Sequence, residues 1–292
     1  MKQVSKSTDT LVGIIGHPIA HTLSPAMHTA AFKKLRIPFV FGVFDVTQEF
    51  LPALVKSLRT KNIAGVNVTI PHKQAVMGLL DNVTVDAAKV GAVNVIVCHD
   101  GTLTGYNTDV AGVTHSLASV RARLRGASIL ILGSGGGARA VAYSLSKEFS
   151  PRRIRIHNRS TERAETMAAE FQKLFPSVRF DTVADQQSFP SAITESTLIV
   201  NATSVGMSPN IDALPVPDHT IFSNQQIIFD IIYNPVETAL LRKARASGAK
   251  VINGVDMLVY QGAAAFELWT GKKFPVELAR SVLLDALTTK KK

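Results

Sequence analysis

The fold is decided by one stretch, Ser128-Ile129-Leu130-Ile131-Leu132-Gly133-Ser134-Gly135-Gly136-Gly137-Ala138. Its first five residues form a short apolar run, which is typical of a strand buried in a parallel sheet. The spacing Gly133-x-Gly135-x-x-Ala138 follows, and then a helical segment, 139–147. Glycines here permit a tight turn and bring a pyrophosphate close to the N–H groups at the helix start, while Ala138 lets helix and strand pack closely. The stretch therefore predicts a dinucleotide-binding strand–turn–helix unit.

The same rhythm of strand and helix continues along the chain. Further strands are expected at 154–157, 197–200, 227–231 and 250–252, and a further helix at 161–174. Alternation of short apolar strands with helices predicts a parallel sheet with right-handed crossovers. We therefore expect an α/β fold with a Rossmann-type, doubly wound domain over residues 109–255.

The residues at the end of the second strand of this domain distinguish between cofactors. NAD sites place a carboxylate about 20 residues beyond the glycine loop to hold the ribose 2′-OH. This chain instead has Asn158, Arg159 and Arg163, and two guanidinium groups with an amide suit a 2′-phosphate. Glu162 alone would favour NAD, although a carboxylate early in a helix is also stabilised by the helix dipole. The turn predicts NADP; the alternative is a solvated basic turn.

The first hundred residues predict a second α/β domain. Strands are expected at 11–15, 39–46 and 65–68, with a hairpin from 93–97 to Leu103 closed around Asp100-Gly101. Helices are expected at 257–269 and 276–287. We predict a substrate-binding domain over residues 1–108, completed by the helices of 256–292.

One helix in this domain should begin near Ser24, with the serine as its cap and Pro25 at the first helical position. Its apolar side is expected to carry Met27, Ala30, Ala31 and Leu35, which recur at helical spacing.

Length and composition bound the class of protein. At 292 residues, two domains with separate cores are expected, and 46% apolar with 18% charged residues is the balance of a folded globular chain. The only cysteine, Cys98, excludes an internal disulfide, and we expect a buried, inert thiol in a reducing compartment. The polar first ten residues lack a signal-peptide core, and no apolar run approaches the roughly 18 residues of a membrane span. We predict a cytoplasmic protein with no membrane partner.

The chain carries a formal net charge of +10, with basic clusters at 121–125, at 152–155 and in the tail 290–292. A basic stripe can bind nucleic acid. These clusters, however, have no interleaved aromatic residues and no helix-turn-helix or zinc pattern, so we expect no nucleic-acid partner. A positive field that attracts an anionic small-molecule substrate and a phosphate-rich cofactor fits better.

A lysine and an aspartate each lie in a polar, glycine-bordered segment ahead of the glycine loop. Lys73 ends the segment 65–73, and Asp109 ends the segment 105–109. With the glycine loop, they indicate a hydride-transfer enzyme whose substrate half precedes its cofactor half. Hydride delivery to a ketone builds negative charge on its oxygen, which an ammonium group stabilises and protonates. The alternative is a surface Lys–Asp ion pair.

The order of these motifs resembles the shikimate dehydrogenase family over essentially the whole chain. The matching segments are 16–25, 67–73, 91–94, 107–109, 133–138, 158–160, 201–207 and 257–261. So many motifs in one order make the resemblance specific. It implies an NADP-dependent oxidoreductase that reversibly reduces 3-dehydroshikimate to shikimate, in aromatic amino-acid (chorismate) biosynthesis.

The resemblance also implies roles for individual residues. Lys73 and Asp109 match the catalytic pair, and Thr22 and Ser24 match residues that hold the substrate carboxylate. Further substrate contacts are implied for Asn67, Thr69, Asn94, Tyr233 and Gln261. Neutral donors and acceptors suit a polyhydroxylated ring, because a site built to pair hydroxyls rejects analogues that lack them.

Cofactor contacts are implied for the glycine loop, the turn after the second strand and two later positions. These residues are Gly133, Gly135, Gly136, Gly137, Ala138, Asn158, Arg159, Arg163, Thr203 and Gly254. The implied cofactor is NADP, and the chain is expected to act as a monomer or homodimer.

Three positions depart from the family pattern. Thr22 stands where serine is common, and its extra methyl lies at the carboxylate end, where shikimate and quinate differ. Val110 and Asp256 replace common glycines without removing a catalytic group. A quinate or dual quinate/shikimate dehydrogenase is therefore the first alternative. A non-catalytic NADP-binding regulatory protein is the alternative of another class, although the presence of both Lys73 and Asp109 argues against it.

Three histidines, His17, His21 and His28, invite a metal-site interpretation. No cysteine or carboxylate cluster accompanies them, and helix placement separates His28 from the loop. We expect packing and loop hydrogen bonds for these residues, and no metal.

Overall fold

The computed structural model describes residues 9–60, 62–183 and 187–289. It divides into two compact units, the first comprising residues 1–108 and 262–292 and the second Asp109–Gln261. The second boundary falls inside one continuous helix, α10 (Val255–Thr270), at 262 instead of the predicted 256. The basic tail 290–292 lies outside the described residues. Within the described ranges, no helix is long and apolar enough to cross a membrane.

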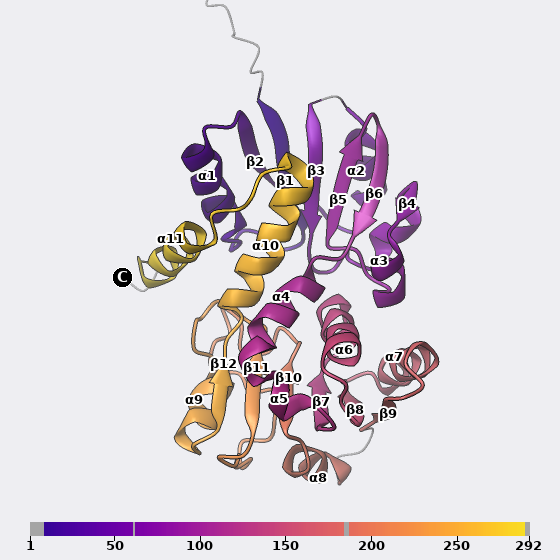
Figure 1. The fold of residues 1–292 in the computed structure, drawn as a ribbon, viewed down its shortest axis with the longest axis vertical. Helices are drawn as coiled ribbons and strands as arrows, with labels where there is room; N and C mark the ends of the chain where they lie inside the picture. Colours follow the sequence, from indigo (N-terminus) through magenta and orange to yellow (C-terminus); the bar gives the residue numbers. More distant parts are fainter. Residues whose placement is uncertain (1–8, 61, 184–186, 290–292) are drawn as a thin grey trace, which may run out of the picture. The chain divides into compact units, whose positions relative to one another are not determined.

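The first unit is built on a mixed sheet of six strands in the order β2-β1-β3-β5-β6-β4 (Figure 1). The strands are β1 (Thr10–Gly16), β2 (Phe39–Asp45), β3 (Ile63–Val68), β4 (Asn82–Val83), β5 (Val95–His99) and β6 (Thr102–Tyr106). The predicted hairpin is confirmed, because β5 and β6 pair antiparallel around Asp100 and Gly101, which both have positive φ. Cys98 in β5 is half-buried, not fully buried as predicted, because it lies near the exposed turn of this hairpin.

Helices cover both faces of this sheet. They are α1 (Ser24–Leu35), α2 (Leu51–Ser57), the short α3 (Val85–Val90), the 262–270 part of α10, and α11 (Val276–Thr289). On one face α2 packs over Ile15, Val66 and Val68. On the other, α1 lies against β2 and α11.

The start and the buried side of α1 differ from the prediction. Leu23 takes the N-cap position, and Ser24, already helical, makes no capping bond with its side chain. Thr22 Oγ1 instead accepts from the Ser24 backbone N–H (3.4 Å). The buried residues of the helix are Ser24, Met27, His28, Ala31 and Phe32, whereas Leu35 is 36% exposed. Aromatic partners from β2 and from α10 explain the shift, because they enclose His28 and Phe32.

The second unit is a parallel sheet in the order β12-β11-β10-β7-β8-β9. Its strands are β7 (Ser128–Leu132), β8 (Arg153–His157), β9 (Arg179–Thr182), β10 (Leu198–Asn201), β11 (Ile227–Asp230) and β12 (Lys250–Ile252). In order of appearance this is 3-2-1-4-5-6, the arrangement of a Rossmann fold, with its switch point between β7 and β10. The predicted Rossmann-type, doubly wound sheet is confirmed.

The helices of this unit are α4 (Asp109–Leu117), α5 (Arg121–Leu124), α6 (Gly136–Glu148), α7 (Thr161–Leu174), α8 (Ser188–Thr194), α9 (Ala239–Ala246) and the 255–261 part of α10. The helix α7 occupies its predicted range, and α6 extends past its predicted range, 139–147, at both ends. The helices α8 and α9 cover the opposite face, over a core that includes Leu130, Ile199 and Ile228.

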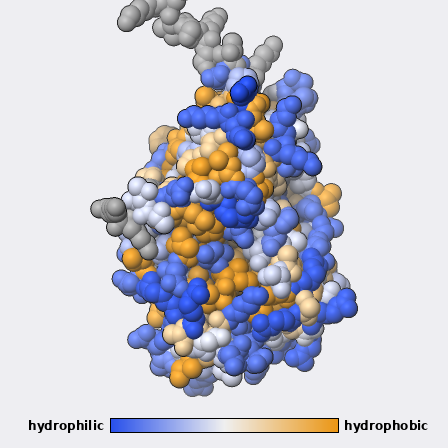
Figure 2. Space-filling model, turned by 60° about the vertical axis from the view of Figure 1, so that its left-hand side comes forward, coloured by the Kyte–Doolittle hydropathy of each residue, from blue (hydrophilic) through white to orange (hydrophobic). Residues whose placement is uncertain are grey.

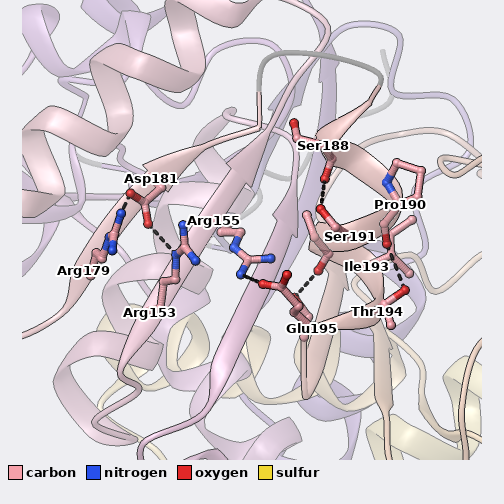
Figure 3. A network of polar contacts seen from close by, with 12 residues as sticks. Arg153, Arg155, Arg179, Asp181, Ser188, Pro190, Ser191, Ile193, Thr194 and Glu195 are labelled. Carbon is pink, nitrogen blue, oxygen red and sulfur yellow. Dashed lines mark hydrogen bonds and ion pairs between the residues drawn. The ribbon is translucent and has the colours of Figure 1, made fainter.

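Part of the basic cluster at 152–155 is used inside this unit. Alternation along β8 directs Arg153 and Arg155 to the same side, where Arg153 pairs with Asp181 of β9 and Arg155 with Glu195 beside α8 (Figure 3). The Arg155 side chain is only 7% exposed. These two charges therefore join neighbouring elements and are not a docking surface.

Apolar residues reach the surface in several patches among hydrophilic ones on the face that Figure 2 presents. The edge strand of the first sheet, β2, has two exposed valines, Val40 and Val43, which are 41% and 44% exposed.

Candidate functional site

The polar residues predicted to hold substrate in the first unit gather where β1 and β3 end. Asn67 lies in β3, and the Thr69 backbone N–H donates to the Ile15 carbonyl (2.9 Å). Gly16 makes this closure feasible, because a Cβ there would lie 2.5 Å from Thr69 Cγ2 and 2.8 Å from Ile19 Cδ1. The turn that carries Thr69 and the loop that leads to Thr22 and Ser24 therefore both close over the end of β1.

Hydrogen bonds tie Asn94 to Thr108. Asn94 Nδ2 donates to Thr108 Oγ1 (2.9 Å), and the Thr108 N–H donates to Asn94 Oδ1 (2.6 Å). The Asn94 carbonyl in turn accepts from the Val68 N–H (2.7 Å) and, at 3.5 Å, from Asn67 Nδ2. The Asn67 side chain is 4% exposed, and its Oδ1 is buried without a hydrogen-bond partner. A buried acceptor left unpaired is costly, so Asn67 Oδ1 is suited to receive a ligand hydroxyl.

The segment that carries Lys73 is anchored on both sides. The Lys73 carbonyl accepts from the Val93 N–H (2.8 Å). Its neighbour His72 is fully buried, and His72 Nε2 donates to the Val46 carbonyl just beyond β2 (2.6 Å). Lys73 is thus held next to Asn94 at the level of the backbone. Asp109 is the first residue of α4 and belongs to the second unit, so the Lys73–Asp109 pairing stays a prediction.

The glycine loop of the second unit has the form that anion binding requires. Gly133 has a φ of 108°, and a Cβ there would lie 3.0 Å from the Ala202 carbonyl oxygen. Gly135 is the N-cap of α6, with ordinary extended dihedrals, and a Cβ there would meet nothing within 4 Å. Ala138 is fully buried. The first N–H groups of α6 lack intrahelical acceptors, so the space beside Gly135 can receive a phosphate.

The turn after β8 carries the residues predicted to select the cofactor. Arg159 and Arg163 are both exposed, Arg159 in the turn and Arg163 in the first helical turn of α7. Asn158 Nδ2 donates to the Ser160 carbonyl (3.0 Å), which keeps the turn compact. Two guanidinium groups at this strand end fit a 2′-phosphate, the group that distinguishes NADP from NAD.

A pocket of about 470 Å³ lies on the α8 side of the same strand end, and no sequence motif predicts it. Its walls include the proline-rich segment 214–217, His219, and His157 stacked on Phe189 with ring centroids 4.1 Å apart. His157 is held in place because Nδ1 donates to the Val183 carbonyl (2.9 Å).

Thr203 lies in a hydrogen-bonded loop after β10. Its N–H and Oγ1 both donate to Asn201 Oδ1, at 3.1 and 2.7 Å, and Asn201 Nδ2 donates to Asp230 Oδ1 (3.1 Å). Asp230 is fully buried, and burial raises its pKa to about 6. No local sequence pattern predicts the contact between Asn201 and Asp230, because it depends on the β10–β11 register.

The remaining predicted residues have local roles that are visible in the second unit. Gly254 is required by packing, since a Cβ there would lie 2.2 Å from the Ile231 carbonyl oxygen. Gln261 Nε2 donates to the Leu258 carbonyl within α10 (2.8 Å). Tyr233 lies just beyond β11 and is half-buried. Their predicted ligand contacts stay predictions.

Three family models match successive parts of the chain. Residues 14–96 match the shikimate dehydrogenase substrate binding domain, 116–232 match shikimate / quinate 5-dehydrogenase, and 254–284 match the shikimate 5′-dehydrogenase C-terminal domain. The first match lies in the first unit and the second match in the second unit.

Individual relatives agree with these models. The chain is 42% identical to the shikimate dehydrogenase (NADP(+)) of Symbiobacterium thermophilum over 98% of its own length and 97% of the relative. The crystal structure of shikimate 5-dehydrogenase from Thermus thermophilus in complex with NADP(H) and shikimate is 36% identical, with a TM-score of 0.83 and coverage of 95% of this chain and 100% of that one. Quinate dehydrogenase from Corynebacterium glutamicum in complex with NAD is 30% identical, with a TM-score of 0.85 and coverage of 95% and 99%.

Proposed function

The chain belongs to the shikimate dehydrogenase family, and on this basis we propose that it reversibly reduces 3-dehydroshikimate to shikimate with NADPH. The observation that carries the proposal is the anchored polar cluster at the end of β3. It fixes the Lys73 backbone beside Asn94 and leaves the buried Asn67 Oδ1 ready for a ring hydroxyl.

Lys73 and Asp109 are proposed as the catalytic pair. The Val93 N–H donates to the Lys73 carbonyl, and the next residue, Asn94, is hydrogen-bonded to Thr108. Asp109 directly follows Thr108 in the chain. Because consecutive Cα atoms are about 3.8 Å apart, this chain of bonds keeps the Asp109 backbone near the Lys73 segment. The Lys73 ammonium stabilises the developing alkoxide and donates a proton to it, while Asp109 orients the ammonium and accepts from the neighbouring ring hydroxyl.

The other substrate contacts follow from the chemistry of the ligand. Thr22 and Ser24 hydroxyls hold the ring carboxylate, and Thr22 is already oriented by accepting from the Ser24 N–H. Asn67, Thr69, Asn94, Tyr233 and Gln261 are proposed to bind the ring hydroxyls and the reacting carbonyl. Such neutral groups discriminate strongly against an analogue that lacks a hydroxyl.

NADP is the proposed cofactor, and when bound it supplies the hydride. The α6 N-terminus with Gly133, Gly135, Gly136, Gly137 and Ala138 would hold the pyrophosphate. Asn158, Arg159 and Arg163 would hold the 2′-phosphate, and Thr203 and Gly254 would border the nicotinamide half.

Quinate is the second candidate substrate. Thr22 adds a methyl group at the carboxylate end, and a quinate dehydrogenase shares this fold at 30% identity. The chain is proposed to act in the cytoplasm, in keeping with its single cysteine. It is proposed to act as a monomer or homodimer, and edge strand β2, with exposed Val40 and Val43, is the surface on which a second copy would pair.

Replacement of Lys73 tests the proposal. Lys73→Ala is expected to lower kcat for shikimate oxidation by roughly 10²–10⁴-fold, the usual contribution of a general acid or base. The affinity for NADP should stay unchanged, as measured by fluorescence titration. Lys89→Ala, which removes an exposed lysine from the last turn of α3, is the matched control. Full turnover in Lys73→Ala would contradict the catalytic role of Lys73, whereas no turnover in the wild type, with NADP still bound, would favour a non-catalytic NADP-binding protein.

A further inference from the structure

Asp230, the last residue of β11, is a buried carboxylate outside the set of predicted site residues. Its side chain accepts three hydrogen bonds. Asn201 Nδ2 and the Ile232 N–H donate to Oδ1 at 3.1 Å each, and Thr238 Oγ1 donates to Oδ2 at 2.7 Å. All three donors are neutral, so the carboxylate is held by oriented dipoles.

Through Asn201, this carboxylate controls the loop after β10. One Asn201 Nδ2 hydrogen bond goes to Asp230 and the other to the Val205 carbonyl (3.1 Å), while Oδ1 receives both donors of Thr203. Thr203 Oγ1 also accepts from the Val205 N–H (3.1 Å). Asp230 thereby fixes which way the Asn201 amide faces, and the amide fixes the Thr203 side chain.

Asp230 also holds the segment that follows β11. Thr238 is the N-cap of α9, where Oγ1 accepts from the Leu241 N–H (3.3 Å) while it donates to Asp230. Ile232, whose N–H binds Asp230, accepts from the Gly254 N–H (3.0 Å). A Cβ on Gly137 of the phosphate loop would lie 2.9 Å from Ile231 Cδ1. The loops after β10 and β11 thus meet around one carboxylate, and Ile231 of the second loop packs beside Gly137 at the start of α6.

Strand order determines which half of a dinucleotide this cluster faces. The pyrophosphate belongs at the β7–α6 turn and the adenosine ribose at the end of β8. Because β10 and β11 lie on the other side of β7, the remaining half of the cofactor extends over their carboxyl ends. Thr203 and the segment 231–238 border that half.

We infer that Asp230, acting through Asn201 and Thr238, is a positioning residue for the nicotinamide half of NADP. The inference rests on the proposed function for the identity of the ligand. Asp230 need not touch the cofactor. It keeps the loops after β10 and β11 in the binding arrangement before the cofactor arrives, which lowers the ordering cost of binding.

The test compares the whole cofactor with its adenosine half. Asp230→Ala should weaken NADP binding about tenfold, as expected for loops that have lost charge-assisted hydrogen bonds. The affinity for 2′,5′-ADP, which reaches only the α6 and β8 ends, should change by less than about twofold. Both values are measured by isothermal titration of the full chain.

Thr238 gives an independent route to the same carboxylate. Thr238→Val removes the donor to Asp230 and should reproduce the selective loss of NADP affinity, whereas Thr238→Ser should bind both ligands as wild type does. Gln226→Leu is the stability control. Gln226 is a buried polar residue that precedes the same strand at its opposite end, where Nε2 donates to the Ile193 carbonyl (2.7 Å).

Three outcomes would overturn the inference. If Asp230→Ala weakened the affinity for NADP and for 2′,5′-ADP equally, Asp230 would have only a general structural role. If neither affinity changed, Asp230 would have no role in cofactor binding. A similar selective loss in Gln226→Leu would contradict it too. A wild-type chain that binds neither ligand would overturn the proposed function itself, a result distinguishable from the others because it appears before any substitution.

Discussion

His28 is a buried imidazole, and it should make the folded state less stable at acidic pH. It is fully buried, neither ring nitrogen has a hydrogen-bond partner, and its ring stacks on Phe41 and Phe266. Burial lowers its pKa from 6.5 to about 3. The unfolded chain therefore binds a proton more readily than the folded one between these values, and stability falls as the pH drops below 6.5.

The size of this effect is measurable. At pH 5 the loss is about 2 kcal/mol, from roughly 1.5 pKa units at 1.36 kcal/mol each. His28→Leu should lose correspondingly less stability between pH 7 and pH 5. Urea unfolding followed by the fluorescence of Trp269, the single tryptophan and a neighbour of His28, reports on this unit. His99→Leu, at a site about 90% exposed, is the control. If the stability of His28→Leu depended on pH in the same way as that of the wild type, His28 would not be the source of the destabilisation at low pH.

Asp230 should respond to pH in the opposite direction. Burial raises its pKa from 3.8 to about 6, so the folded state favours the protonated form. The corresponding stability is present below pH 3.8 and is lost as the pH rises through 6, which amounts to about 3 kcal/mol at neutral pH. In Asp230→Asn, which cannot ionise, stability relative to wild type should rise between pH 4 and pH 7, as followed by circular dichroism in urea. A constant difference across this range would count against the raised pKa.

At the scale of elements, the turn between β7 and α6 contains two glycines with different roles: Gly133 is needed for the backbone conformation, and Gly135 leaves space for the cofactor. Gly133→Ala places a side chain at a φ of 108° and against the Ala202 backbone, and should cost about 1–3 kcal/mol of stability. Gly135→Ala enters open space with allowed dihedrals, so stability should be kept. The new methyl group occupies the approach to the α6 N–H groups, and NADP affinity should fall. Thermal unfolding and NADP titration of both variants test this, and NADP binding at wild-type strength in Gly135→Ala would show that the pyrophosphate lies elsewhere.

Elements with strong local patterns could be predicted from the sequence, and those defined by distant partners could not. The apolar runs of β7, β10 and β11 and the turn at Asp100-Gly101 carry their own signals. The short β9 does not, because its place depends on pairing with β8, where Asp181 binds Arg153. The predicted buried side of α1 was right for Met27 and Ala31 but wrong for Leu35, and it lacked His28 for the same reason, since residues of α10 far along the chain enclose His28.

The candidate site shows the same division. The glycine loop and the polar residues around Lys73 were found from motifs and from the family resemblance. The link between Asn201 and Asp230 was not, because 29 residues separate them and only the register of β10 and β11 brings them together.

At the scale of the whole molecule, each unit contributes a distinct part of one proposed reaction. The first unit supplies neutral polar groups and Lys73, and the second supplies a Rossmann sheet with basic residues at the cofactor end. The net charge of +10 favours an anionic ring acid and a phosphate-rich cofactor alike.

The most direct measurement is a set of initial rates for shikimate and quinate, each with NADP and with NAD, from the absorbance of the reduced cofactor. We predict the highest kcat/KM for shikimate with NADP, with Arg159→Ala raising KM for NADP far more than KM for shikimate. No cofactor reduction with shikimate, or a preference for quinate with NAD, would contradict the account.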